Sequence, residues 1–107
     1  MKLKQFQRCA LLATTLLCGP AALAHGPAFD CYLEREGQVK CVAGFTDGSS
    51  AVGRKILVRD LGGKVLLEGD VGPDSSFGFQ VPQDPYSVTF LGGEGHEVTL
   101  QSADITP

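Results

Sequence analysis

The sequence predicts an all-β domain of seven antiparallel strands, folded as a sandwich or a small barrel. Clusters of Gly, Pro, Asp and Ser recur about every ten residues, with short runs rich in β-branched and aromatic residues between them. No segment has a sustained helical period. The predicted strands are residues 28–35, 38–46, 54–61, 64–69, 76–81, 86–91 and 97–105.

A secretory signal peptide precedes these strands. Basic residues open the chain, an apolar run follows over residues 9–18, and Ala22-Leu23-Ala24 is a small-residue cleavage site. The apolar run is shorter than the roughly 20 residues that span a bilayer, so we expect no membrane-embedded segment. The expected organisation is therefore a signal peptide over residues 1–24 and one β-sandwich domain over residues 25–107.

Cys18 leaves a lipoprotein signal as an alternative. A lipid-modified cysteine would also follow an apolar run, but Leu17 stands where such a signal favours a small side chain. Cleavage after Ala24 is the better match, and it makes His25 the first residue of a periplasmic or secreted protein.

The net charge of the predicted mature chain limits the classes of partner that it can bind. All 12 acidic residues and six of the nine basic residues follow Ala24, which gives a net charge of −6. Nucleic acid and anionic lipid are poor partners for such a surface, whereas cations are better ones. At 83 residues after Ala24, the chain is long enough for one small domain.

Cys31 and Cys41 are the cysteines that remain after cleavage, and we expect them to form one disulfide. A thiolate metal site or a redox pair is the alternative. Nine residues separate the two, which is not the C-x-x-C spacing of redox and zinc motifs.

The first two strands predict a hairpin with a defined register. A three-residue loop over residues 35–37, with Gly37 in the left-handed conformation, is a standard closure. The alternation of side chains then places the apolar residues and both cysteines on the core face. The facing pairs are Leu33 with Val39, Cys31 with Cys41, and Phe29 with Ala43.

The later strands supply the rest of the expected core. Residues 61–63 should close a second hairpin, and apolar residues alternate along the strands that follow. The predicted core positions are Ile56, Val58, Val65, Leu67, Phe77, Phe79, Val81, Val88 and Phe90.

His25 and His96 are candidate metal ligands. An N-terminal histidine offers its α-amine and its ring Nδ1 as a chelate, and a second imidazole would complete a near-planar set of three nitrogens. Such a set suits Cu(II) or Ni(II). The alternative is that neither histidine has a role beyond solvation, since His25 only follows a cleavage site and His96 lies in a glycine-rich loop.

Strand directions predict that the two histidines share one end of the domain. If neighbouring strands are antiparallel, the connections over residues 46–53, 70–75 and 92–96 return to the end at which the chain enters. Acidic residues also lie at or near that end, and we regard Asp47, Glu94 and Glu97 as possible auxiliary ligands. Asp70 and Asp74 belong to the same end.

No catalytic motif is present in the sequence. It contains no nucleophile elbow, no phosphate-binding glycine loop between a strand and a helix, and no H-E-x-x-H. We therefore expect a binding protein and not an enzyme.

Six segments of the sequence carry a resemblance to known proteins. They are Ala24-His25-Gly26, Val42-Ala43-Gly44-Phe45-Thr46-Asp47-Gly48-Ser49, Ile56-Leu57-Val58-Arg59-Asp60, Gly63-Lys64-Val65-Leu66-Leu67-Glu68-Gly69, Ser76-Phe77-Gly78-Phe79 and Gly93-Glu94-Gly95-His96. Together they resemble the small periplasmic accessory proteins encoded beside nickel and cobalt uptake transporters. The strand pattern is similar to the Ig-like, transthyretin-like β-sandwich of the carboxypeptidase-regulatory type.

The resemblance implies a function. It implies capture of a divalent metal, nickel first, with cobalt or copper as further possibilities, and delivery to a membrane metal transporter. The Cys31–Cys41 bridge is not a feature of the proteins that it resembles. The alternative function is that of a metal-free structural or protein-interaction module of the cell envelope.

Overall fold

The computed structural model describes residues 26–107, so the predicted signal peptide and His25 lie outside the described residues. Within this range the chain forms seven strands and two short 3-10 turns, as the predicted all-β class requires. The strands are β2 (Pro27–Leu33), β3 (Gln38–Phe45), β4 (Lys55–Asp60), β5 (Val65–Asp70), β6 (Ser76–Gln80), β7 (Tyr86–Leu91) and β8 (Glu97–Gln101). The turns are η3 (Arg35–Gly37) and η4 (Ser102–Asp104).

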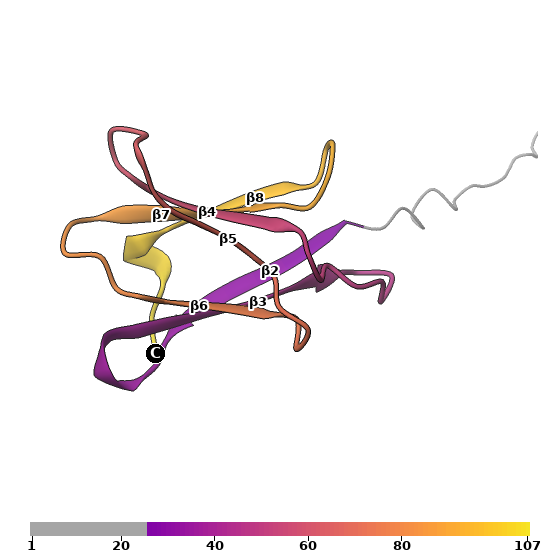
Figure 1. Ribbon diagram of the computed structural model, residues 1–107, viewed down its shortest axis with the longest axis horizontal. Coiled ribbons are helices and arrows are strands. Elements are labelled where there is room, and N and C mark those ends of the chain that lie inside the picture. The colour runs from indigo at the N-terminus through magenta and orange to yellow at the C-terminus, as the bar shows by residue number, and fades with distance from the viewer. Residues whose placement is uncertain (1–25) are drawn as a thin grey trace, which may run out of the picture.

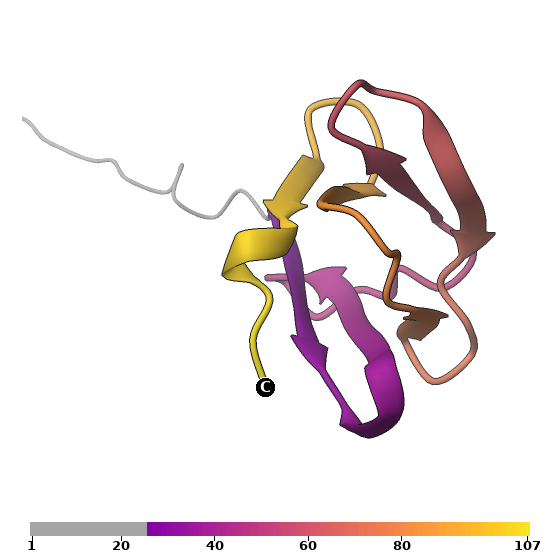
Figure 2. The same cartoon turned by 90° about the vertical axis from the view of Figure 1, so that its left-hand side faces the viewer.

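The strands form two antiparallel sheets that pack as a sandwich. One sheet has the order β2-β3-β6 and the other the order β5-β4-β7-β8. Figures 1 and 2 show the two layers from perpendicular directions. Of the two arrangements that the sequence left open, the structure has the sandwich and not the barrel.

The β2–β3 hairpin has the predicted register. Gly37 is left-handed with a φ of 73°, and Glu36 joins it with a φ of 63°. The loop thus needs two residues with positive φ, of which only the glycine was expected. The facing pairs include Leu33 with Val39, Cys31 with Cys41, and Phe29 with Ala43.

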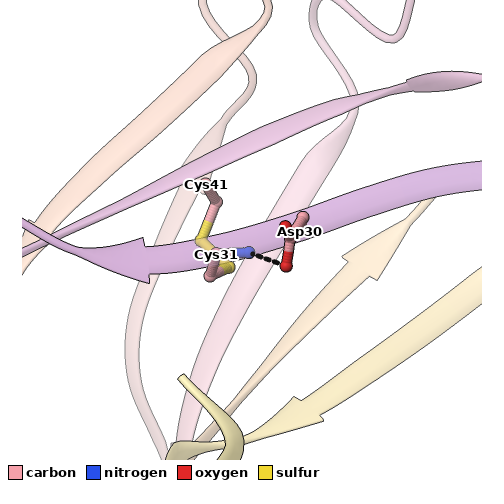
Figure 3. The surroundings of a disulfide bond; sticks show 3 residues. All are labelled: Asp30, Cys31 and Cys41. Atoms are coloured by element: carbon pink, nitrogen blue, oxygen red, sulfur yellow. Dashed lines mark hydrogen bonds between the residues drawn. A yellow bond between two sulfur atoms is a disulfide. The ribbon is translucent and has the colours of Figure 1, made fainter. Parts of the chain in front are cut away.

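The predicted disulfide joins Cys31 to Cys41 across this hairpin (Figure 3). Both cysteines are buried in the core between the sheets. The backbone N–H of Cys31 also donates a hydrogen bond of 3.0 Å to Asp30 Oδ1. The thiolate metal site and the redox pair are therefore not needed to explain the two cysteines.

Aromatic rings from both sheets meet at Phe90, which is fully buried. The ring centroids of Phe29 and Phe45 lie 5.3 and 5.9 Å from that of Phe90. Of the other predicted core residues, Ile56, Val58, Phe79 and Val88 are buried, and Phe77 and Val81 pack against the core partly buried.

The prediction that Val65 and Leu67 belong to the core is wrong. They are 45% and 40% exposed, and Leu66 between them is 44% exposed. β5 is an edge strand, and its register slips at Leu66, because Val58 faces Leu67 whereas Arg59 faces Val65. The bulge turns Val65 to the face of Arg59, away from the core, whereas Leu67 stays opposite the buried Val58 and is uncovered because β5 is the edge strand.

The last strand is shorter than predicted. It ends at Gln101, not at residue 105, and η4 turns the chain back toward β2. Ile105 is then buried, and the N–H of Leu33 donates a 3.1 Å hydrogen bond to the carbonyl oxygen of Thr106. Figure 2 shows this final segment beside β2. The C-terminal residues therefore close one side of the sandwich.

Candidate functional site

Three connections gather at one end of the sandwich, on the right in Figure 1. The N–H of Gly53 donates to the carbonyl oxygen of Val71 at 2.8 Å, and the N–H of Val71 donates to that of Arg54 at 2.9 Å. Lys55 at the start of β4 faces the last residues of β5 and β7. The predicted convergence of residues 46–53, 70–75 and 92–96 is thus present.

The described chain begins at this same end. The N–H of Gly26 donates a 2.9 Å hydrogen bond to Thr46 Oγ1, and the N–H of Thr46 donates one of 2.8 Å to the carbonyl oxygen of Gly26. These bonds continue the β2–β3 ladder by one residue beyond the pair of Pro27 and Phe45. Residue 26 is therefore fixed against the end of β3. His25 precedes it and lies outside the described residues.

His96 is held at the same end by a tight turn. Its N–H donates a 2.9 Å hydrogen bond to the carbonyl oxygen of Gly93, and its carbonyl oxygen accepts one of 3.1 Å from Gly92. Gly93 and Gly95 have φ values of 116° and 78°, which L side chains disfavour. The turn presents the half-buried His96 ring edge-on to Phe45, with centroids 6.0 Å apart and an interplanar angle of 86°.

Gly26 and His96 therefore contact consecutive residues of the chain. Gly26 bonds to Thr46, and the His96 ring lies against the ring of Phe45. As predicted, His96 lies at the end of the sandwich at which the chain enters, and Gly26 is the first described residue at that end. The distance from His25 to His96 stays a prediction.

The predicted auxiliary carboxylates differ in their surroundings. Asp47 follows Thr46 directly, and its Oδ1 accepts hydrogen bonds from the N–H and the hydroxyl of Ser49 at 2.9 and 2.7 Å. Glu94 lies in the His96 turn, Glu97 begins β8, and both are exposed. Among residues 26–107, no group of three or more His, Cys, Asp or Glu side chains is placed to hold a metal ion.

Asp70 and Asp74 have other partners. Asp70 Oδ1 lies 3.0 Å from Lys55 Nζ, and this hydrogen bond and ion pair raise the pKa of Lys55. Asp74 Oδ1 accepts hydrogen bonds from the hydroxyl and the N–H of Ser76, which lower the pKa of its carboxyl. These carboxylates stabilise local structure at this end.

Arg54 is a residue of this end that the sequence reasoning missed. Its guanidinium carbon lies 6.0 Å from the centroid of the Phe45 ring. A Cβ atom placed on Gly93 would lie 3.5 Å from Arg54 Nη1, so the guanidinium also lies beside the His96 turn. The position of Arg54 at the start of the third predicted strand was the available signal, because that strand begins at the shared end.

Comparison with protein-family models, with curated proteins and with solved structures yields no match. Among residues 26–107, no helix is long and apolar enough to cross a membrane.

Proposed function

We propose that the mature protein is a periplasmic transition-metal binding protein that supports a membrane metal transporter, with nickel or cobalt as its cargo and copper as a further candidate. The observation that carries this proposal is the placement of Gly26 and His96 on consecutive residues, Thr46 and Phe45. The residue before Gly26 is a histidine, which becomes the chain start if cleavage follows Ala24.

The three predicted nitrogen donors favour a late first-row transition metal. The α-amine and ring Nδ1 of His25 and the imidazole of His96 would supply three nitrogens, a set that Ni(II) and Cu(II) favour over Mg(II) or Ca(II). Asp47, next to Thr46, is the auxiliary carboxylate nearest along the chain to the contacts of Gly26. Glu94 and Glu97 flank His96 in sequence and add negative charge to the same end.

The compartment and the finer fold type complete the proposal. The intramolecular Cys31–Cys41 disulfide fits an oxidising compartment. The two antiparallel sheets accommodate an Ig-like or transthyretin-like sandwich of the carboxypeptidase-regulatory type, which is the fold that the resemblance implies.

Calorimetry on exported protein tests the metal site. Mass spectrometry first establishes that the chain starts at His25, and Ni²⁺ is then titrated into this protein, into His96→Ala and into His25→Ala. Both altered proteins should bind Ni²⁺ at least about tenfold more weakly, because each loses a nitrogen from its place in the set. Equal affinity of all three would contradict the proposal.

A second candidate function is a metal-free interaction module, and the β5 edge favours it. Val65, Leu66 and Leu67 expose 40–45% of their surface along a strand with one free edge. Exposed strand edges with apolar side chains pair readily with other chains. Exported protein with a start other than His25, and without measurable Ni²⁺, Co²⁺ or Cu²⁺ binding, would select this function over the metal site.

A further inference from the structure

We propose that two copies of the chain associate through their β5 edges, as antiparallel neighbours in one continuous sheet. The inference concerns the surface that favours the second candidate function, and it names a second copy of this chain as the partner. It uses no residue of the proposed metal site. β5 forms one edge of the four-stranded sheet, at the right in Figure 2, and among residues 26–107 its ladder partner is β4 alone.

The exposed large apolar side chains of the described residues gather on β5 and at its two ends. They are Val52, Leu61, Val65, Leu66 and Leu67. Leu61 lies in the turn before β5, and Val52 precedes Gly53, whose N–H donates to the carbonyl oxygen of Val71 directly after β5. Within residues 26–107, Val42 is the one exposed large apolar residue elsewhere. An antiparallel second copy would cover the central three and bring the turn of each copy to the far end of the other.

The charges along β5 favour an antiparallel pair of like strands. Lys64 directly precedes the strand, and Glu68 and Asp70 lie in its second half. Lys55 Nζ of β4 lies 3.5 and 3.0 Å from carboxylate oxygens of these two residues, so one negative charge is in excess there. In the part of the chain that the structure describes, Lys64 forms no ion pair. An antiparallel pair sets Lys64 of each copy beside the acidic end of the other, whereas a parallel pair would bring like charges together.

The bulge at Leu66 favours a second copy over a regular strand as the partner. Val58 faces Leu67 whereas Arg59 faces Val65, so the edge of β5 is shifted by one residue at this point. A regular strand cannot match the shift along its whole length, and bulges protect sheet edges in this way. A second copy carries the same shift. A two-fold axis between Leu66 and Leu67 sets the two shifts opposite each other, and the leucines of one copy then meet those of the other.

Sedimentation equilibrium of the exported protein tests the inference, with EDTA present so that no metal ion can bridge two copies. A two-fold interface of this kind closes on itself, so the mass should rise with concentration to that of a dimer and no further. One pair of short strands buries less than the roughly 1,600 Å² of a standard interface, so the expected Kd is about 10–100 µM. Leu66→Lys places two positive charges at the axis and should stay a monomer. Val42→Lys is the matched control, because Val42 is an equally exposed apolar residue on the central strand of the other sheet, and it should dimerise like the unmodified protein.

A charge swap tests the antiparallel direction. Lys64→Glu should weaken the dimer by about fivefold, because two opposite-charge contacts become repulsive. Lys64→Glu combined with Glu68→Lys should restore most of the affinity, since the swap exchanges the signs of the two ends. If the double variant dimerised no better than Lys64→Glu, the antiparallel arrangement would be wrong.

Thermal unfolding establishes that each variant is folded. An unmodified protein that stays a monomer at concentrations up to about 1 mM would overturn the inference, since such an interface would then be weaker than any expected here. Equal dimerisation of the unmodified protein and Leu66→Lys would overturn it too, because another surface would then join the copies. Ni²⁺ titration of Leu66→Lys measures the proposed metal site separately, and its affinity should equal that of the unmodified protein. Neither failure of the dimer would alter that result.

Discussion

The imidazole of His96 stands edge-on to the ring of Phe45, and this contact ties the Gly92–His96 turn to the end of β3. Phe45 in turn packs on Phe90 in the core, with ring centroids 5.9 Å apart. The position of His96 is thus set by the core and not by its loop alone. Four predictions follow from contacts of this kind, and each can be measured on the isolated protein.

Gly92→Ala should move His96. A Cβ atom on residue 92 would lie 2.7 Å from the carbonyl oxygen of His96 and 2.9 Å from the Phe90 ring, so the turn must shift. The His96 ring proton resonances, displaced by the Phe45 ring in the unmodified protein, should return toward random-coil values, and Ni²⁺ affinity should fall severalfold. Gly44→Ala is the control, because its nearest neighbour beyond the adjacent residues, the Ser49 carbonyl oxygen, would be 3.9 Å away. Unchanged resonances in Gly92→Ala would contradict the prediction.

Gly69→Ala should destabilise the sandwich. The Phe77 ring of β6 lies directly on Gly69 of β5, so an added methyl group would run into the ring. The cost should be about 1–3 kcal/mol in the free energy of unfolding, which urea denaturation measures. Gly26→Ala has nothing within 4 Å of the new methyl group and should leave stability close to that of the unmodified protein. Equal midpoints for the two variants would show that Phe77 does not restrict β5.

Ile105→Ala tests the closure of the sandwich by the C-terminal segment. Ile105 is 4% exposed and belongs to the core cluster, so its truncation should cost about 2–5 kcal/mol. Leu61→Ala, at a side chain that is 67% exposed, should change stability by less than about 0.5 kcal/mol. Thermal unfolding of the two variants decides the point. If Ile105→Ala lost no more free energy of unfolding than Leu61→Ala, the C-terminal residues would not contribute to the stability of the sandwich.

Ser76→Ala should change how stability depends on pH. The hydroxyl and the N–H of Ser76 both donate to Asp74 Oδ1, and they lower the pKa of that carboxyl below its usual 3.8. A lowered folded-state pKa stabilises the protein above the unfolded value and loses this effect as pH falls through the folded value. The variant should therefore be less stable than the unmodified protein above about pH 4 and equally stable in stronger acid. NMR titration should place the Asp74 pKa higher in the variant, and an unchanged value would contradict the assignment.

The sequence was sufficient to predict the features that depend on residues close together in the chain. The β2–β3 register followed from a three-residue loop, and it brought Cys31 opposite Cys41 without knowledge of the remaining strands. The convergence of three connections at one end followed from the antiparallel order. Both inferences depend on neighbours along the chain, and the structure confirms both.

Burial and side-chain contacts that depend on the order of the strands in a sheet, or on the direction of a long side chain, could not be predicted from local rules. Val65 and Leu67 alternate like core residues, but whether they are buried depends on which strand forms the edge and on the bulge at Leu66. The contact of Arg54 with Phe45 depends on the direction of a long side chain. His96 has its predicted place, whereas the meeting of His25 and His96 stays a prediction because His25 lies outside the described residues.

The Cys31–Cys41 bond has a consequence for the order in which the protein matures. It crosslinks β2 to β3, and these are the strands whose ends carry Gly26 and the Phe45–Thr46 pair. β2 is an edge strand whose ladder partner is β3, and on its other side Leu33 bonds to the carbonyl oxygen of Thr106. In a reducing cytosol this strand would lack its covalent anchor. The bond that forms under oxidising conditions therefore secures Gly26, which precedes β2, against the end of β3.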